Sequence, residues 1–270
     1  MIISANFSCT NNFNVARYKV TAKLLPSIIQ TISVGEMARR ALQAIYGKQQ
    51  DGGSSKIFSG KDVNGVPMSG HEHAFFLPTD EDGDSRLDHL TVVTQTPFGS
   101  KELQALQYLT NIRGKEGFSS IGLVLTECGN MQTMRHVALI SESSVWRSVT
   151  PFVPTRHYKR RGQKRDTCDR EDFVEVVLKE EIVRRGRSDP KQIRRIPWCE
   201  MRDFKEKRVT VSSPIPWSQF ERERVFGFGR KGDGPGGGFE IEFNDPVQGP
   251  IALGYGCHYG LGLFVPTREG

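Results

Sequence analysis

Apolar residues in the first half of the chain recur with the spacings of strands and helices. Alternation of apolar and polar positions predicts a strand over residues 17–29. A capping-box sequence at Ser33 and Glu36, followed by apolar residues at helical spacing, predicts a helix that ends near Tyr46. The same rules predict a helix over residues 100–112 and strands over residues 74–77, 87–95 and 120–126. The resulting β-α-β-β-α-β order over residues 15–127 is typical of a ferredoxin-like fold.

The second half of the chain has a less regular pattern. It predicts a helix over residues 170–185 and strands over residues 146–153, 192–196, 221–228, 239–243 and 261–265. We expect a degraded second copy of the same order, although the two halves share no detectable sequence repeat. The predicted fold class is therefore α+β, with two ferredoxin-like (RRM-like) lobes in tandem over residues 1–140 and 141–270, the second of them irregular.

The composition is that of an ordinary folded protein. The 270 residues are 37% hydrophobic and 25% charged. No run of about 18 apolar residues is present, and residues 1–10 are too polar for a signal peptide. The five cysteines are scattered and form no CxxC pair. These features predict reduced thiols and a cytoplasmic protein that does not associate with a membrane.

Positive charge is concentrated in the second half of the chain. Up to residue 140 there are 13 Lys+Arg against 12 Asp+Glu, and beyond it 24 against 19. Residues 156–165 and 184–195 each hold six Lys or Arg, and each is accompanied by an aromatic residue, Tyr158 or Trp198. Such a stretch is often only a solvated surface, but two of them with aromatic neighbours favour nucleic-acid binding. The predicted RNA contacts are Arg156, His157, Lys159, Arg160, Arg161, Lys164, Arg165, Arg194 and Arg195.

Glycines cluster near the C-terminal end in two groups with different meanings. Residues 227–262 hold 12 of the 28 glycines. The group over residues 227–238 is typical of a flexible loop between strands. In the second group glycines alternate with apolar or aromatic residues and lead directly into the last strand. It is neither a Walker loop nor a Rossmann fingerprint. We expect its backbone N–H groups to face an anion, with contacts from Gly254, Gly256, His258, Tyr259, Gly260 and Gly262.

Three segments together resemble a known family. Residues 70–90, 146–157 and 254–264 are similar to the Csb2 family of type I-U (I-G) CRISPR systems, which is itself similar to a Cas5–Cas6 fusion. A glycine-rich loop before the last strand also resembles the RNA-binding loop of the RAMP superfamily. The resemblance extends over about residues 17–265, and 270 residues leave no room for a Cas5 half.

The resemblance implies a Cas6-type endoribonuclease. Such an enzyme cleaves CRISPR precursor RNA within its repeats, without metal or other cofactor, to leave a 2′,3′-cyclic phosphate and a 5′-hydroxyl. It can keep hold of the repeat-derived 3′ end of the mature crRNA. The implied partners are CRISPR repeat RNA and other Cas proteins of a type I effector complex.

Metal-independent RNA cleavage requires a base, an acid and cations, and histidine suits both proton-transfer roles. His71 and His73 are two residues apart at the predicted start of a strand, so we expect both rings on one face, as a catalytic acid–base pair. Many Cas6 enzymes place a catalytic histidine in or near the first helix, but residues 26–48 contain none. A non-catalytic crRNA-binding subunit of a type I effector (Cascade) complex therefore stays open as the alternative.

An acidic segment offers a third and weaker hypothesis. Carboxylates at Asp80, Asp82, Asp84 and Asp88 surround Gly83 and resemble part of a calcium loop. The spacing departs from the EF-hand pattern, because glycine stands fourth and Thr91 occupies the twelfth position. An acidic hairpin turn is the favoured interpretation.

Overall fold

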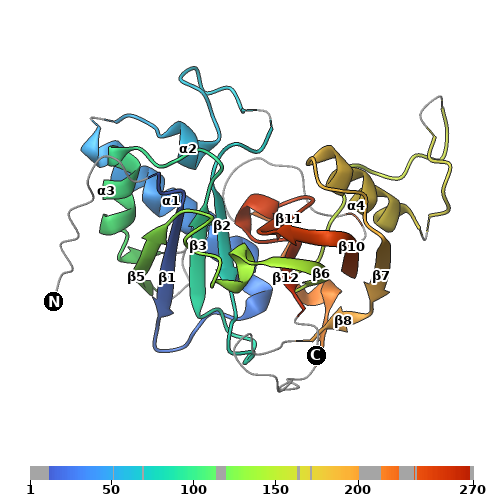
Figure 1. Cartoon of the computed structure of the whole chain (residues 1–270). Helices are drawn as coiled ribbons and strands as arrows, with labels where there is room; N and C mark the ends of the chain where they lie inside the picture. Colours follow the sequence, from blue (N-terminus) through green and yellow to red (C-terminus); the bar gives the residue numbers. More distant parts are fainter. Residues whose placement is uncertain are drawn as a thin grey trace.

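The computed structural model describes residues 12–50, 52–68, 70–113, 120–162, 165–170, 172–200, 214–224, 234 and 236–267. Within these residues, two five-stranded sheets lie side by side, the first with α-helices α1 (Thr31–Gln49) and α3 (Ser100–Tyr108) and the second with the single α-helix α4 (Phe173–Arg184) (Figure 1). No helix in this part of the chain is both long enough and apolar enough to span a bilayer.

The first sheet has the strand order of a ferredoxin-like fold. In chain order its elements are β1 (Val15–Thr21), α1 (Thr31–Gln49), β2 (Phe75–Thr79), β3 (His89–Val93), α3 (Ser100–Tyr108), β4 (Asn111–Ile112) and β5 (Ile121–Gly129). The strands are arranged β2-β3-β1-β5-β4, with every pairing antiparallel. Apart from the short edge strand β4, this confirms the predicted β-α-β-β-α-β lobe.

The core of the first lobe follows from the alternation in β1. Ala16, Tyr18 and Val20 are buried in one cluster with apolar residues of α1 and α3. The hydroxyl of Tyr18 donates a hydrogen bond to the carbonyl of Leu106 at 2.7 Å, so its polar atom is satisfied inside the core.

The beginning of α1 differs from the prediction. The capping box forms at Ser27 and Gln30, around the 3-10 turn η1 (Ile28–Gln30), and α1 follows directly from Thr31. Ser33 and Glu36 are buried inside the helix, where Ser33 donates to Glu221 and Glu36 pairs with Arg224. The expected capping box at Ser33 and Glu36 is therefore wrong, because both side chains serve long-range contacts instead.

Other predicted boundaries shift by a few residues. The strand expected over residues 17–29 ends at Thr21. The strand expected to end at residue 77 continues through Pro78 to Thr79, which an edge strand tolerates because one side of its backbone needs no partner. The helix expected to reach residue 112 ends at Tyr108. A short helix, α2 (Lys56–Ser59), lies in the segment between α1 and β2.

The second sheet repeats the same strand order without the second helix. Its elements are β6 (Glu142–Ser148), α4 (Phe173–Arg184), β7 (Gln192–Ile196), β10 (Gly238–Gln248), β11 (Ile251–Ala252), η4 (Cys257–Tyr259) and β12 (Leu263–Pro266). The strand order of this sheet is β11-β12-β6-β10-β7. Its strands β12, β6, β10 and β7 occupy the positions that β5, β1, β3 and β2 occupy in the first sheet. The glycine-rich segment, residues 249–262, contains β11 and η4 and takes the place of the second helix. This confirms two ferredoxin-like lobes of which the second is irregular.

Minor elements complete the described part of the chain. A two-stranded sheet pairs β8 (Trp198–Cys199) with β9 (Ile215–Pro216), and two 3-10 turns are η2 (Ala138–Ile140) and η3 (Trp217–Gln219). The strand expected over residues 146–153 forms earlier, as β6. Residues 221–224 of the strand expected over residues 221–228 are not in a strand, and the rest of it lies outside the described residues. So does most of the expected loop over residues 227–238.

The two sheets are joined by a shared apolar cluster. Val15, Leu77 and Val93 of the first sheet are buried together with Ala252 and Leu263 of the second. The turn η4 packs against α1 so closely that a Cβ at Gly35 would lie 2.7 Å from the carbonyl oxygen of Tyr259. The glycine-rich segment is therefore held against the helix and edge strand of the first lobe (Figure 1).

Candidate functional site

Three histidines from the two lobes meet where the glycine-rich segment contacts β2. Nδ1 of His71 lies 2.8 Å from Nε2 of His258. The ring of His258 is stacked between those of His73 and Phe75, with centroid distances of 3.7 and 3.9 Å. The sequence pairs His71 with His73, but the structure makes His258 the residue that both contact.

His71 and His73 do not lie on a strand, contrary to the prediction. β2 begins only at Phe75, so His71 and His73 lie in the turn before the strand and strand alternation does not align them. His71 has a left-handed φ of 60°, directly after Gly70 with a φ of 89°. A non-glycine residue in this region is uncommon and is found mainly where the surroundings fix it. Here the contact of its ring with His258 is such a constraint.

The hydrogen bonds fix the position of the protons in this cluster. Nδ1 of His258 lies 3.1 Å from the carbonyl oxygen of Ala74, which can only accept. In a neutral ring Nε2 of His258 is then the acceptor, so Nδ1 of His71 must donate to it. When His71 is also neutral, its Nε2 carries an available lone pair. This tautomer is assigned from the hydrogen-bond partners.

The environment keeps all three rings neutral near pH 7. Burial, followed by the charge of neighbouring His71, lowers the pKa of His73 to about 4. Burial also holds the pKa of His258 well below its usual value, again with help from His73. The pKa of half-buried His71 is lowered by burial and by the charge of Arg185. Neutral imidazole is the form that accepts a proton.

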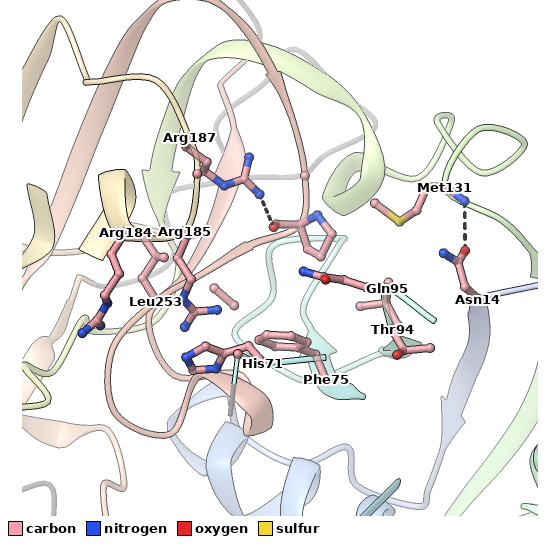
Figure 2. A pocket seen from close by; sticks show the side chains of 16 residues that line it. Asn14, His71, Phe75, Thr94, Gln95, Met131, Arg184, Arg185, Arg187 and Leu253 are labelled. Carbon is pink, nitrogen blue, oxygen red and sulfur yellow. Dashed lines mark hydrogen bonds between the residues drawn. The ribbon is translucent and has the colours of Figure 1, made fainter. Parts of the chain in front are cut away.

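A cavity of about 880 Å³ opens beside His71, between the two lobes (Figure 2). Arg184, Arg185 and Arg187 line it on one side, and the described lining contains no acidic residue. Figure 2 shows the guanidinium group of Arg185 directed toward the ring of His71. A concave site with one sign of charge concentrates anions.

A buried carboxylate connects these arginines to the glycine-rich segment. Oε1 of Glu181 on α4 accepts from Nη2 of Arg185 at 2.9 Å and from the backbone N–H of Gly254 at 2.9 Å. Arg187 donates to the carbonyls of Gln248 and Pro250 at 2.7 and 2.8 Å. Burial, followed by the charge of Arg185, lowers the pKa of Arg187 to about 10. The end of α4 is thereby fixed to the segment that carries His258.

Together with Cys257, two of the three histidines are close enough to one another to bind a metal ion. One donor atom each of His71, Cys257 and His258 lies within 4.8 Å of the others. Nη2 of Arg185, however, lies 3.5 Å from Sγ of Cys257, and burial raises the pKa of that thiol to about 11. A neutral thiol beside a guanidinium group is a poor ligand for a cation.

The backbone N–H groups of three glycines in the segment donate to other groups of the chain. The N–H groups of Gly254, Gly260 and Gly262 donate to Glu181, Cys257 and Pro151. These three N–H groups are therefore occupied within the chain, that of Gly254 by a carboxylate, and are not open to an external anion. At Gly262, φ is 58° and a Cβ would lie 1.8 Å from the carbonyl oxygen of Leu253. Glycine is needed there because two backbone segments touch.

The first basic stretch is largely solvent-exposed, beside α4. Arg156 is the exception, because it pairs with Asp166 at 2.5 Å and with Glu180 and lies over the ring of Phe173. The exposed members of this stretch are His157, Lys159, Arg160, Arg161 and Arg165. Lys164 lies outside the described residues. Arg156 therefore has a structural role that its position in the basic stretch did not indicate.

The second basic stretch divides between two places. Arg194 and Arg195 lie on the edge strand β7, where they pair with Glu240 at 2.5 Å and with Glu175 at 3.9 Å. Arg184, Arg185 and Arg187 line the cavity, and they were not among the residues predicted individually. Their position at the end of a helix that returns toward the glycine-rich segment is visible only in the folded chain.

The acidic segment is folded as a turn. Asp80 accepts the backbone N–H groups of Gly83 and Ser85 at 2.8 and 2.7 Å. Asp84 accepts from the N–H of Arg86 at 2.8 Å. Burial, followed by the charge of neighbouring carboxylates, raises the pKa of Asp80 to about 7 against the effect of these hydrogen bonds. The carboxylates thus organise their own turn, as expected of an acidic hairpin.

Comparisons with known proteins show a distant likeness to a solved structure. No family model matches the chain, and no curated protein matches it. A solved structure, a Cas6 (TTHB231) product complex, has 10% sequence identity and a TM-score of 0.40 over 95% of this chain and 100% of that chain. A TM-score of this size does not establish a shared fold, so the ferredoxin-like assignment rests on the strand order of each sheet.

Proposed function

We propose that this chain is a Cas6-type endoribonuclease that cleaves CRISPR precursor RNA within its repeats without a metal ion. The observation that carries the proposal is the hydrogen-bonded pair His71–His258 beside an arginine-lined cavity. It supplies a neutral base next to cations, which metal-independent RNA cleavage requires. The resemblance of three segments to the Csb2 family of type I-U (I-G) systems supports CRISPR repeat RNA as the substrate.

The proposed reaction uses one histidine as a proton shuttle. Nε2 of His71 takes the proton of the 2′-hydroxyl, and the oxygen attacks the adjacent phosphorus. The bond to the 5′-oxygen breaks, and the same proton passes from His71 to that oxygen. The products are a 2′,3′-cyclic phosphate and a 5′-hydroxyl, and His71 returns to its neutral form. Arg184 and Arg185 stabilise the charge that develops on the phosphoryl oxygens.

His73 and His258 support His71 in this proposal. The hydrogen bond from His71 to His258 holds the reactive ring in one tautomer. His73 stacks on His258, and a pKa of about 4 keeps its ring uncharged. The predicted acid–base pair thus becomes one reacting histidine with two neighbours that orient it.

In the proposed complex with RNA, the two lobes supply different functional groups. We place the boundary at residue 140, so that residues 1–140 supply His71 and residues 141–270 supply the cations. The exposed part of the stretch over residues 156–165, together with Arg194 and Arg195, extends the positive surface along which an RNA backbone can lie. Retention of the repeat-derived 3′ end would follow from contacts of this kind.

The test is incubation with the cognate repeat RNA in the presence of EDTA, followed by analysis of the product ends. We expect a single cleavage in each repeat with a 2′,3′-cyclic phosphate on one product and a 5′-hydroxyl on the other. Loss of all cleavage in EDTA, or products with a 5′-phosphate, would overturn the metal-independent mechanism.

The second candidate function is a crRNA-binding subunit of a type I effector (Cascade) complex that cuts nothing. The observation that favours it is the absence of histidine from α1 and its flanks, residues 26–48. Tight binding of the repeat RNA without any product, at enzyme concentrations above that of the RNA, would select this candidate.

A further inference from the structure

We propose that the cavity beside His71 is a nucleotide subsite, in which a phosphate lies against Arg184 and Arg185 and the attached base stacks on Phe75. The inference rests on the proposed function, because it identifies the nucleotide next to the cleaved phosphate as the occupant. A volume of about 880 Å³ is within the ~300–1,000 Å³ typical of small-molecule sites.

The two sides of the cavity differ in chemistry. Arg184 and Arg185 come from the end of α4 and lie on the same side as His71, whereas Asn14, Thr94 and Gln95 lie on the opposite side (Figure 2). One side therefore suits a phosphate and the other suits the hydrogen-bonding edge of a base. A nucleotide is a ligand with this asymmetry.

The cationic side has donors available for a phosphate. Glu181, whose side chain is 2% exposed, holds Arg185 in place through one Nη group. Nε of Arg185 is buried, and among the described residues the hydrogen bonds of its guanidinium group are made by Nη2, to Glu181 and Cys257, which leaves Nη1 as the available donor. Arg184 is 64% exposed at the rim. The guanidinium groups are therefore positioned without all their donors being used, which is the arrangement that suits phosphate binding.

Phe75 supplies an aromatic surface between the two sides. One face of its ring is covered by His258 at 3.9 Å, and the ring also lines the cavity. The part that reaches the cavity is thus its edge and opposite face. Stacking on an aromatic side chain is the usual way in which proteins hold a single-stranded base. A base on Phe75 would lie next to the histidine cluster and so would place its phosphate near His71.

The polar side can distinguish bases through amide groups. Oδ1 of Asn14 accepts the backbone N–H of Met131 at 3.2 Å, which fixes the side chain and leaves its amino group as a donor. Gln95 is exposed at the rim and offers both a donor and an acceptor. These groups read the edge of a base, whereas inorganic phosphate would contact only the arginine side.

The test compares ribonucleoside 3′-monophosphates with inorganic phosphate by isothermal titration of the full chain. We expect nucleotides to bind roughly 5- to 150-fold more tightly than phosphate, the contribution of one stacked base. Phe75→Leu keeps an apolar side chain and should reduce nucleotide affinity to the level of phosphate. Arg184→Gln should weaken nucleotide and phosphate alike.

Matched variants and an uncleavable RNA complete the experiment. Tyr108→Leu, at an aromatic residue of α3 that is 61% exposed and outside the cavity, should leave both affinities unchanged. Repeat RNA with 2′-fluoro groups lacks the attacking hydroxyl, and we expect it to displace the nucleotide. The proposal is overturned if the unmodified chain binds the nucleotides no more tightly than phosphate. It is also overturned if the 2′-fluoro RNA binds without displacing the nucleotide. Failure of the proposed function appears separately, as an unmodified RNA that is bound but not cut.

Discussion

His71 and His258 are separated by 187 positions in the sequence, yet their rings share a hydrogen bond of 2.8 Å. The bond joins the turn before β2 of the first lobe to the glycine-rich segment of the second. It therefore makes the proposed base depend on both lobes. It also gives His71 a defined tautomer, because the other nitrogen of His258 is committed to the carbonyl of Ala74.

Replacement of His258 should impair cleavage by loss of orientation. His258→Phe keeps an aromatic ring between His73 and Phe75 but cannot accept the hydrogen bond from His71. We expect the single-turnover rate to fall on the order of 10²-fold, because a misplaced reacting group costs about that much.

His258→Gln separates orientation from packing in the same assay. A glutamine restores an acceptor and should recover part of the lost rate, together with the pH profile of the unmodified enzyme. If the Phe variant cleaves at the unmodified rate, or if neither rate nor pH profile differs between the two variants, His258 does not position His71.

The pH dependence of cleavage should report His71. Its pKa is lowered below the ordinary value of about 6.5 by burial and by Arg185. The neutral, proton-accepting form therefore predominates already at pH 7. We expect the single-turnover rate to rise from acid pH with an inflection below pH 6.5 and to level off near neutrality. An inflection above pH 7 would contradict the assignment of His71 as the base.

His73 should make the fold sensitive to acid. Its pKa is about 4 in the folded chain and about 6.5 in the unfolded chain, so the unfolded state binds more protons between these values. Its contribution to stability is complete above pH 6.5 and is lost as the pH falls toward 4. We expect His73→Gln to flatten the fall in the free energy of unfolding over this range, measured by urea titration.

Two comparisons isolate this effect. Asp80, whose pKa is raised to about 7, acts in the opposite direction, but it is present in both proteins and cancels in their difference. His157→Gln, at an exposed histidine, is the control and should leave the slope unchanged. Parallel curves for the unmodified protein and His73→Gln between pH 4 and 6.5 would rule out the effect.

Glu181 should be important for stability although it does not react. Its buried carboxylate holds Arg185 and the N–H of Gly254. Glu181→Ala leaves that guanidinium without its partner, and removing one member of a buried pair costs about 3–5 kcal/mol. Glu175→Ala on the same helix removes a largely exposed pairing with Arg195 at 3.9 Å and should cost roughly 0–1 kcal/mol. Equal unfolding midpoints for the two variants would contradict this role.

The sequence was sufficient for the order of elements because that order depends on local periodicity. Alternation around Tyr18 and helical spacing after Ser33 each mark an element, and the ferredoxin-like strand order follows from them. Their boundaries depend on tertiary contacts, and so the capping box was misplaced: Ser33 and Glu36 bond to Glu221 and Arg224, far along the chain.

The site was only partly predictable for the same reason. His71, His73 and His258 were all selected, but on separate grounds, and nothing in their spacing shows that one ring would lie between its neighbours. The arginines at the end of α4 were part of a recognised basic stretch, yet their contacts with the glycine-rich segment, through Glu181 and directly from Arg187, exist only in the folded chain. The sequence marks the glycines as unusual, but the N–H groups of Gly254, Gly260 and Gly262 donate hydrogen bonds to other groups of the chain.

Neutral His71 is the proposed base for cleavage of RNA without a metal ion. The most direct test is the single-turnover rate of cleavage of the cognate repeat RNA in EDTA, for the unmodified chain and for His71→Ala, with His136→Ala, at an exposed histidine outside the cavity, as the control. We expect the His71 variant to be roughly 10²–10⁴-fold slower, the contribution of general acid–base catalysis, with RNA affinity and thermal stability little changed. Cleavage by His71→Ala at the rate of the unmodified chain would contradict the account.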